Sequence, residues 1–524
     1  MIFSEKLLQA RNKKGVSQEA VAEAIGVSRQ AIQKWESGAS MPDISNLISL
    51  ASYFNLSIDY LVTGKDTRSI EEVRVSSNAE PTFDKWNHYE AYYKNLGVEY
   101  LQSIDEGKDI SAYKNLFDAV NAMPNTKEKA EMADTIYKLV SKAPQVKDYP
   151  YVEPSDFDAI KELSDFSFGV KPVKKDEKLK EKIAGAWYGR ICGCLLGKAV
   201  EGMKYDELSI FLKRTGNSPM HRYIVKSEAE KNGEGLEFPI KDRAYTDGIM
   251  DGMPVDDDTN YIIIAYLALL NHGRDFTSED MANIWILTQG KNAYCTAERV
   301  AYRNFVNGYL PPESAVYKNP FREWIGAQIR GDYFGWICPG DPESAANMAW
   351  RDARMSHIKN GIYGEMWVSA MLAAAATGLG IKDTINAGLA YIPKTSRLYE
   401  AIQKVIAEYD SGKSQKEFFD DFHKRWDDRN GHHWCHTISN AEIVTACLLY
   451  GGGDYGKSVC MAVEQGFDTD CNAATVGSVV GMIIGKSGIP SEWKDKIDGK
   501  LNTSIFGYQK VNVDEMVEKT LEMI

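Results

Sequence analysis

The chain has 524 residues, of which 44% are hydrophobic and 26% are charged, a composition typical of a soluble globular protein with a large core. No run of about 18 uncharged apolar residues occurs, and residues 1–10 lack a signal-peptide pattern, so we expect a cytoplasmic protein that spans no membrane. The net charge of −13 excludes a general nucleic-acid binder, and the 8 cysteines lack the paired spacing of a zinc site or a disulfide framework.

The first part of the chain carries the pattern of a small helical bundle. Ser17 opens one helix as its cap, and Gly26 ends that helix. Ser28 then caps a second helix that runs to Trp35. A further amphipathic helix is predicted over Ile44 to Phe54. Two helices joined by a short glycine-containing turn form the helix-turn-helix arrangement.

The stretch Ser17 to Gly38, with the later Leu56 to Thr63, closely resembles the Cro/repressor family of DNA-binding domains. This resemblance implies that residues 1–64 bind a DNA operator, and we expect them to do so as a homodimer. Residues 1–70 hold 8 Lys and Arg against 7 Asp and Glu, a balance of about +1 that sets them apart from the acidic remainder. The expected DNA contacts come from Arg29, Gln30 and Gln33 on bases, Lys34 on phosphate and Gln18 on the DNA backbone. A three-helix bundle with a purely structural role is the alternative.

Two segments connect this bundle to the rest of the chain. Residues 65–83 are polar and of low hydrophobicity, and we interpret them as a linker. Residues 84–145 predict a helical extension. Its expected helices run over Trp86 to Leu101, Tyr113 to Ala122 and Lys127 to Ser141.

Residues 146–524 form one large domain in this interpretation. From Leu179 onward the sequence has helical patterns, long glycine-containing connections and few alternating strand patterns. The predicted fold class is therefore all-α, with the helix-turn-helix bundle followed by this large all-helical domain.

Two acidic clusters, far apart in the sequence, each precede an apolar helical run. They consist of Asp256, Asp257 and Asp258, and of Asp468 and Asp470. Carboxylates this close repel one another and are costly beside apolar segments unless a cation neutralises them. Mg²⁺ takes oxygen ligands, which suits two such clusters that converge. The alternative is that both clusters only cap helices, since Asp is favoured at that position.

The region from Ala184 to Gly485, which includes both clusters, resembles the ADP-ribosylglycohydrolase family. Two further motifs carry the resemblance. One is the glycine-rich segment Gly185 to Glu201, which is similar to the family's first helix and the acidic loop after it. The other is the segment Pro339 to Glu365, which contains Ser356 and His357.

The resemblance implies a hydrolase that cleaves an ADP-ribosyl or related ribosyl bond with two magnesium ions. The expected metal ligands are Asp256, Asp257, Asp258, Asp468, Asp470 and Cys471. Glu201 and Asp257 are the expected catalytic residues, although Glu201 taken alone would be an ordinary loop glutamate. Cys471 stands where the family usually has Thr or Ser, and a thiol is a poorer Mg²⁺ ligand, so we expect one metal to bind more weakly or through water.

The expected substrate contacts are Gly466, Asn440, His357 and Thr437. We expect His357 to orient a neighbouring side chain or a carboxylate. The cluster His432 to His436 invites a zinc interpretation, but consecutive histidines point in different directions, and we expect it to line the sugar pocket instead. The aromatic stretch Gln328 to Trp336 fits adenosine contacts and core packing equally well.

Two functions fit these residues. The first is a DNA-binding protein with a magnesium-dependent ADP-ribosyl glycohydrolase domain, a transcription regulator that responds to ADP-ribose or a related ribosylated small molecule or protein. The second is a catalytically impaired repressor that only senses such a ligand. Glu201 and the motif aspartates favour the first function, whereas Cys471 and the fusion to a DNA-binding segment favour the second.

Overall fold

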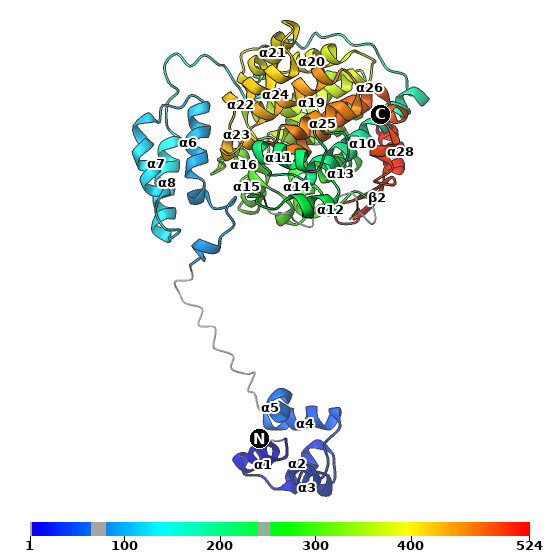
Figure 1. The fold of residues 1–524 in the computed structure, drawn as a ribbon. Helices are drawn as coiled ribbons and strands as arrows, with labels where there is room; N and C mark the ends of the chain where they lie inside the picture. The colour runs from blue at the N-terminus through cyan, green and yellow to red at the C-terminus, as the bar shows by residue number, and fades with distance from the viewer. Residues whose placement is uncertain (1–2, 64–79, 239–246, 248–251) are drawn as a thin grey trace. The chain divides into compact units, whose positions relative to one another are not determined.

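The computed structural model describes residues 3–63, 80–238, 247 and 252–524 (Figure 1). The chain divides into two compact units, Met1–Thr82 and Phe83–Ile524. Residues 65–79 of the predicted linker lie outside the described residues. Both units are built almost wholly from helices, which confirms the predicted all-α fold.

The described part of the first unit contains the predicted helix-turn-helix. Its helices are α1 (Phe3–Lys14), α2 (Gln18–Ile25), α3 (Arg29–Glu36), α4 (Ile44–Phe54) and α5 (Ile58–Thr63). Both predicted serine caps are confirmed, because Ser17 Oγ accepts from the Ala20 amide at 3.1 Å and Ser28 Oγ accepts from the Ala31 amide at 3.2 Å. Gly26 ends α2 with a positive φ of 75°. The core is formed by Leu7, Val21, Ile32, Leu50 and Leu61, all fully buried.

The second unit begins with the helical extension. Its elements are the 3₁₀ turns η1 (Phe83–Lys85), η2 (Tyr92–Lys94) and η3 (Ser111–Tyr113) and the helices α6 (Leu96–Asp105), α7 (Lys114–Asn121) and α8 (Lys127–Val140). The first helix begins at Leu96 and not at Trp86 as predicted. Asn side chains compete with the backbone here, since Asn87 Oδ1 accepts from the Tyr89 amide at 3.0 Å and Asn95 Nδ2 donates to the Ala91 carbonyl at 3.1 Å.

Buried charges fasten α6 to the rest of the unit. Arg322 donates to Glu99 Oε1 at 2.9 Å and to Glu106 Oε1 at 2.6 Å. Gln102 Nε2 donates to Glu323 Oε2 at 2.6 Å. All five side chains are buried. The extension is therefore docked on the body through a buried polar interface.

The body contains the remaining helices. Its first half consists of α9 (Phe157–Glu162), α10 (Glu177–Lys198), α11 (Tyr205–Arg214), α12 (Lys226–Asn232), α13 (Asp257–His272), α14 (Ser278–Thr288), η5 (Lys291–Ala293), α15 (Thr296–Val306), α16 (Glu313–Val316), η6 (Gln328–Arg330) and α17 (Asp332–Trp336). Its second half consists of α18 (Pro342–Ala353), α19 (Lys359–Ala375), α20 (Ile381–Leu389), α21 (Arg397–Asp410), α22 (Gln415–Arg425), α23 (Gly431–Cys435), α24 (Thr437–Gly451), α25 (Tyr455–Glu464), α26 (Thr469–Ile484), η7 (Lys486–Gly488), α27 (Ser491–Lys494) and α28 (Val513–Met523). In the described part of the chain, no helix combines the length and apolar character needed to cross a membrane.

One short antiparallel hairpin interrupts the helical body. Strand β1 (Lys500–Asn502) pairs with β2 (Lys510–Asn512), with Leu501 opposite Val511. Met253, just before α13, forms a bridge to Leu501. The hairpin thus supports the segment that leads into the first acidic cluster, and it is too small to change the fold class.

Glycines bring α10 and α26 into close contact at the centre of the body. Four of them recur every fourth residue on α10, at Gly185, Gly189, Gly193 and Gly197. A Cβ atom at any of these positions would clash with the α26 backbone, at Gly481, Gly477, Ala473 and Thr469 respectively. Because this stripe is free of side chains, the end of α10 lies directly beside the start of α26.

We expect Gly189→Ala to lower the free energy of unfolding of the body by about 1–3 kcal/mol, the usual cost of overpacking a tight core. The added methyl group meets the Gly477 carbonyl, which belongs to a rigid helix backbone. Urea unfolding followed by circular dichroism measures the change. Gly97→Ala is the control, since a Cβ there has nothing within 4 Å, and equal stabilities of the two variants would contradict this packing.

Candidate metal and substrate site

The two acidic clusters lie at the N-termini of two buried helices. Asp256 precedes α13, and its Oδ1 accepts from the Asp258 amide at 2.9 Å. Asp468 precedes α26 but, within the described residues, its side chain makes no capping hydrogen bond. The capping alternative therefore accounts for one oxygen of Asp256 and leaves Asp468 unexplained. The positive end of each helix dipole helps to keep the carboxylates charged.

The structure brings the two clusters together. The donor atoms of Cys194, Asp256 and Asp258 lie within 4.8 Å of one another, and so do those of Asp258, Asp470 and Cys471. Asp258 belongs to both groups and is the point where the clusters meet. We use the name acidic cluster for Asp256, Asp257, Asp258, Asp468 and Asp470.

Two bases from α10 also reach this cluster, and the sequence did not reveal them. Arg190 is fully buried and donates to Asp258 Oδ1 at 2.8 Å, while its other amino group lies 2.9 Å from Asp332 Oδ2. Lys198 Nζ pairs with Asp256 Oδ2. Arg190, Cys194 and Lys198 are spaced four residues apart, so they share one helix face. That spacing is the signal that could have identified them.

Negative charge in the cluster exceeds what these bases neutralise. Burial raises the pKa of Asp258 well above its usual range, against the effect of the Arg190 guanidinium. Burial, together with the charges of Glu201 and Asp256, raises the pKa of Asp470 as well. Asp256 differs, because the Lys198 ammonium outweighs burial and lowers the pKa of Asp256. The cluster as a whole is short of positive charge.

Unpartnered oxygens show that the cluster fits a hard divalent cation. In the described part of the chain, Asp258 Oδ2 and Asp470 Oδ1 are buried and have no hydrogen-bond partner. Such groups are costly unless a ligand satisfies them, and carboxylate oxygens are preferred by Mg²⁺. Cys471 adds little, since burial and the charge of Asp258 raise the pKa of its thiol well above the usual range, and a thiol is a poor Mg²⁺ ligand.

Asn440 supports the second half of the cluster from α24. Its Oδ1 accepts from the Asp468 amide at 3.3 Å and from Asn472 Nδ2 at 2.8 Å. Its Nδ2 donates to the His436 carbonyl at 2.9 Å. Gly466 lies just before the cluster with a positive φ of 66°, next to the Tyr205 backbone. Both residues shape the loop that presents Asp468.

Glu201 and Asp257 lie on the accessible side of the cluster. Both are partly exposed, whereas Asp258 and Asp470 are buried. Burial and then the charges of Asp256, Asp258 and Glu201 raise the pKa of Asp257 well above its usual range. The carboxylate of Glu201 is thus close enough to act on Asp257 and Asp470.

His357 and Thr437 are fully buried, and their expected substrate contacts stay predictions. His357 Nδ1 lies 2.8 Å from Ser356 Oγ, which accepts from Arg330 at 3.1 Å. Arg330 in turn lies 2.9 Å from Glu298 Oε1. Thr437 Oγ1 donates to the Trp324 carbonyl at 2.9 Å. In this structure both residues belong to buried polar networks.

The histidine cluster forms a second group with metal-like spacing, but its hydrogen bonds disfavour a metal. His432, His436 and Asp105 of α6 have donor atoms within 4.8 Å. Trp324 Nε1 donates to His432 Nδ1 at 3.1 Å, so the proton is on Nε2, which lies 2.8 Å from Asp105 Oδ2. The Ile438 amide donates to His436 Nδ1 at 3.1 Å, which again puts the proton on Nε2. Neither Nε2 has a lone pair for zinc.

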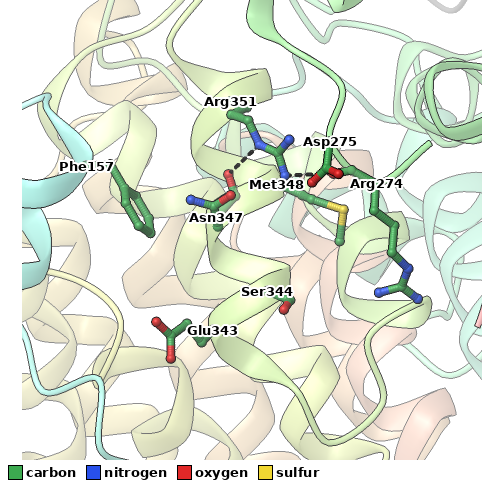
Figure 2. A pocket seen from close by; sticks show the side chains of 8 residues that line it. All are labelled: Phe157, Arg274, Asp275, Glu343, Ser344, Asn347, Met348 and Arg351. Atoms are coloured by element: carbon green, nitrogen blue, oxygen red, sulfur yellow. Dashed lines mark hydrogen bonds between the residues drawn. The ribbon is translucent and has the colours of Figure 1, made fainter. Parts of the chain in front are cut away.

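A separate hollow beside α18 contains two arginines (Figure 2). It has a volume of about 400 Å³ and is lined by Phe157, Arg274, Asp275, Glu343, Ser344, Asn347, Met348 and Arg351. Arg351 donates to the Phe276 and Arg274 carbonyls at 2.7 and 2.8 Å. Arg274 donates to the Ile337 carbonyl at 2.7 Å. Because these guanidinium groups already have protein acceptors, we assign them to holding the chain segments together.

The predicted DNA contacts lie on the surface of the first unit. Four of them are exposed on α3: Arg29, Gln30, Gln33 and Lys34. Gln18, at the start of α2, is partly buried and donates to Glu36 Oε2 at 2.7 Å. Glu36 also pairs with Arg11 at 2.6 Å. Gln18 therefore stabilises the packing of α2 on α3, and its contact with DNA stays a prediction.

Two family models match the chain, one over the body that contains the acidic cluster and one over the helix-turn-helix unit. The family model described as ADP-ribosylglycohydrolase matches residues 175–522. The chain belongs to the ADP-ribosylglycohydrolase family. A helix-turn-helix family model matches residues 7–61. Both resemblances that the sequence motifs indicated are thereby confirmed.

Individual relatives are similar to the N-terminal part of this family member. It is 38% identical over 84 residues to the HTH-type transcriptional activator BcrR of Enterococcus faecalis, which corresponds to 16% of this chain and 41% of that protein. It is 31% identical over 84 residues to the uncharacterized HTH-type transcriptional regulator YqaE of Bacillus subtilis (strain 168), 16% of this chain and 72% of that protein. The chain thus spans less than half of the first relative. A solved structure described as an ADP-ribosylglycohydrolase-related protein complex matches with a TM-score of 0.42 and 18% identity, over 66% of this chain and 98% of that chain.

Proposed function

We propose that the body hydrolyses an ADP-ribosyl or related ribosyl bond with magnesium at the acidic cluster. We further propose that the first unit binds a DNA operator, which makes the chain a transcription regulator that responds to an ADP-ribose-like ligand. The observation that carries the proposal is the convergence of buried carboxylates whose oxygens, at Asp258 and Asp470, lack partners within the described residues. Family membership supports the reaction class, and the helix-turn-helix domain supports DNA binding.

The chemistry requires a fixed sugar, a water and a proton donor or acceptor. Hydrolysis at the anomeric carbon passes through an oxocarbenium-like state. When bound, magnesium would supply the positive charge that fixes ribose hydroxyls and activates water, with Asp256, Asp257, Asp258, Asp468 and Asp470 as its ligands. Glu201 is partly exposed beside these residues and is suited to move a proton as general acid or base. Asn440 holds the Asp468 backbone in place.

A catalytically impaired sensor is the second candidate, and two observations favour it. Lys198 already neutralises Asp256, which reduces the attraction of that carboxylate for a metal ion. Cys471 remains a protonated thiol beside Asp258 and Asp470. Turnover of an ADP-ribosyl substrate by the full chain in Mg²⁺ would support the hydrolase. ADP-ribose binding without turnover would support the sensor. If the chain neither binds ADP-ribose nor turns over the substrate, both candidate functions are ruled out.

The DNA-binding part of the proposal predicts a sequence-specific effect of α3 substitutions. Arg29→Ala or Gln30→Ala should weaken binding to a selected operator by about 1–3 kcal/mol and relax its sequence preference, because these side chains are exposed on the recognition helix. Selection from a random duplex library, followed by titration at fixed salt, measures the effect. Lys34→Ala is the comparison, since loss of a phosphate contact should weaken all sequences alike. A library that yields no enriched motif would contradict the prediction.

The two functions should also be coupled. We expect saturating ADP-ribose and Mg²⁺ to change operator affinity by a factor of about 5–150, and operator to change ADP-ribose affinity by the same factor. The reason is that one chain carries both sites. Operator titration with and without the ligand measures the coupling. Equal affinities with a ligand shown separately to bind would mean that the DNA-binding unit only tethers the body.

A further inference from the structure

The segment just before η2 of the extension is clamped onto the body. Glu90 is buried and accepts from Lys291 Nζ at 2.9 Å and from Arg299 at 3.3 Å. Arg303 of α15 donates to the Glu90 carbonyl. Arg299 and Arg303 both belong to α15, whose first residue, Thr296, follows Cys295. This clamp fixes the position of the neighbouring residue, Tyr89.

A short series of contacts connects Tyr89 to the acidic cluster. Its ring meets Phe321 edge to face at 5.8 Å, and Phe321 packs on Trp324 at 4.7 Å. The next residue, Ile325, donates its amide to the Cys435 carbonyl at 2.8 Å. Cys435 Sγ donates to Asp468 Oδ2 at 3.8 Å. Tyr89 therefore packs on the segment from Phe321 to Ile325, which is bonded to Cys435 and through it to Asp468.

The hydroxyl of Tyr89 lies in the field of the accessible carboxylates. Burial raises the pKa of Tyr89 well above its usual value, and the charges of Cys295, Cys435, Glu201 and Asp257 add to this effect. The phenol thus stays a neutral hydrogen-bond donor. Within the described residues it has no hydrogen-bond partner, and the side chain is only partly buried. A donor without a protein acceptor, within electrostatic reach of Glu201 and Asp257, is available to a ligand.

We propose that Tyr89 forms the extension's side of the ligand site and donates a hydrogen bond to a sugar hydroxyl of a ribosylated nucleotide held at the acidic cluster. The proposal rests on the proposed function. A sugar hydroxyl suits the position better than a phosphate, because the Glu201 carboxylate would repel an anion. The aromatic ring adds an apolar wall for the sugar. The ligand is then held between the extension and the body.

With Tyr89 at the ligand, the extension has a role in ligand selection. The ADP-ribosylglycohydrolase family model begins at residue 175, so Tyr89 and Glu90 lie outside the part that the chain shares with that model. The part shared with the model supplies the acidic cluster, and the added segment supplies one wall. Ligand preference should therefore change with Tyr89 while metal binding does not.

The test measures ADP-ribose binding to the full chain in Mg²⁺ by calorimetry, for the wild type, Tyr89→Phe and Tyr89→Ala. Loss of one hydrogen bond should weaken binding about three- to tenfold in Tyr89→Phe, with at least the same loss in Tyr89→Ala. Tyr113→Phe is the control, because Tyr113 is another partly buried tyrosine of the extension that packs on the extension's own core. Mg²⁺ affinity without ADP-ribose should be equal in all four proteins, which a merely structural role of Tyr89 would not predict.

Each outcome is decisive. Weaker ADP-ribose binding in a Tyr89 variant, with Mg²⁺ affinity and thermal unfolding unchanged, supports the inference. If the wild type binds ADP-ribose and both Tyr89 variants bind it equally well, the inference is overturned while the proposed function stands. If Tyr89→Ala unfolds, Tyr89→Phe, which keeps the ring packing, decides. If the wild type does not bind ADP-ribose, the proposed function fails and the inference fails with it.

Discussion

Asp470→Asn is expected to weaken Mg²⁺ binding by at least about 100-fold and to abolish glycosidic activity. Residues that merely support metal ligands cost about 10–100-fold when they are replaced, and a direct ligand should cost more. Asp470 is the clearest choice, since within the described residues one of its oxygens is buried without a hydrogen-bond partner and its carboxylate forms no salt bridge. Asparagine keeps the size and removes the charge, so the effect reports the loss of an anionic ligand.

Calorimetric Mg²⁺ titration of the full chain measures this effect. Asp206→Asn is the matched control, because Asp206 is an exposed aspartate whose partner is Arg429 at the surface. Asp257→Asn and Asp468→Asn should behave like Asp470→Asn. Unchanged Mg²⁺ affinity in all three variants would refute the metal assignment.

The second large effect concerns the buried ion pairs that hold the extension on the body. Arg322→Ala should lower the free energy of unfolding by about 3–5 kcal/mol, because it leaves the buried carboxylates of Glu99 and Glu106 without their guanidinium partner. The Arg322 side chain is 4% exposed, so water cannot replace the lost partner. Lys382→Ala is the control. Its ion pair with Asp410 is about half exposed and should contribute less than about 1 kcal/mol.

Chemical unfolding measures the stability lost in Arg322→Ala, and limited proteolysis measures how readily the extension detaches. We expect earlier unfolding of Arg322→Ala and faster cleavage within the extension. ADP-ribose binding should weaken as well if Tyr89 reaches the ligand. Equal stability of the Arg322 and Lys382 variants would show that the buried ion pairs do not hold the extension.

Local features of the fold were predictable from the sequence. The serine caps at Ser17 and Ser28 and the bounds of α4 follow from interactions a few residues apart, and all are confirmed. The start of α6 was predicted wrongly because the side chains of Asn87 and Asn95 compete with helical hydrogen bonds. Helix propensity alone does not predict these side-chain hydrogen bonds.

The acidic cluster was only partly predictable. The motif aspartates were found, since clustered carboxylates before an apolar helix are conspicuous in a sequence. Arg190 and Lys198 were missed because they lie in a glycine-rich helix, and their role appears only when α10 packs beside the start of α13. The contact between Asp105 and His432 likewise depends on the docking of α6, 327 residues away in the sequence. The four-residue spacing of Arg190 and Lys198 is visible in the sequence, but the partners of these side chains depend on long-range packing.

A crystal structure of the full chain with ADP-ribose and Mg²⁺ tests the central claim most directly. We predict magnesium at about 2.0–2.1 Å from carboxylate oxygens of Asp258 and Asp470, with the ribose of ADP-ribose beside Glu201. ADP-ribose bound elsewhere, or an acidic cluster that stays free of metal with Lys198 still paired to Asp256, would contradict the account.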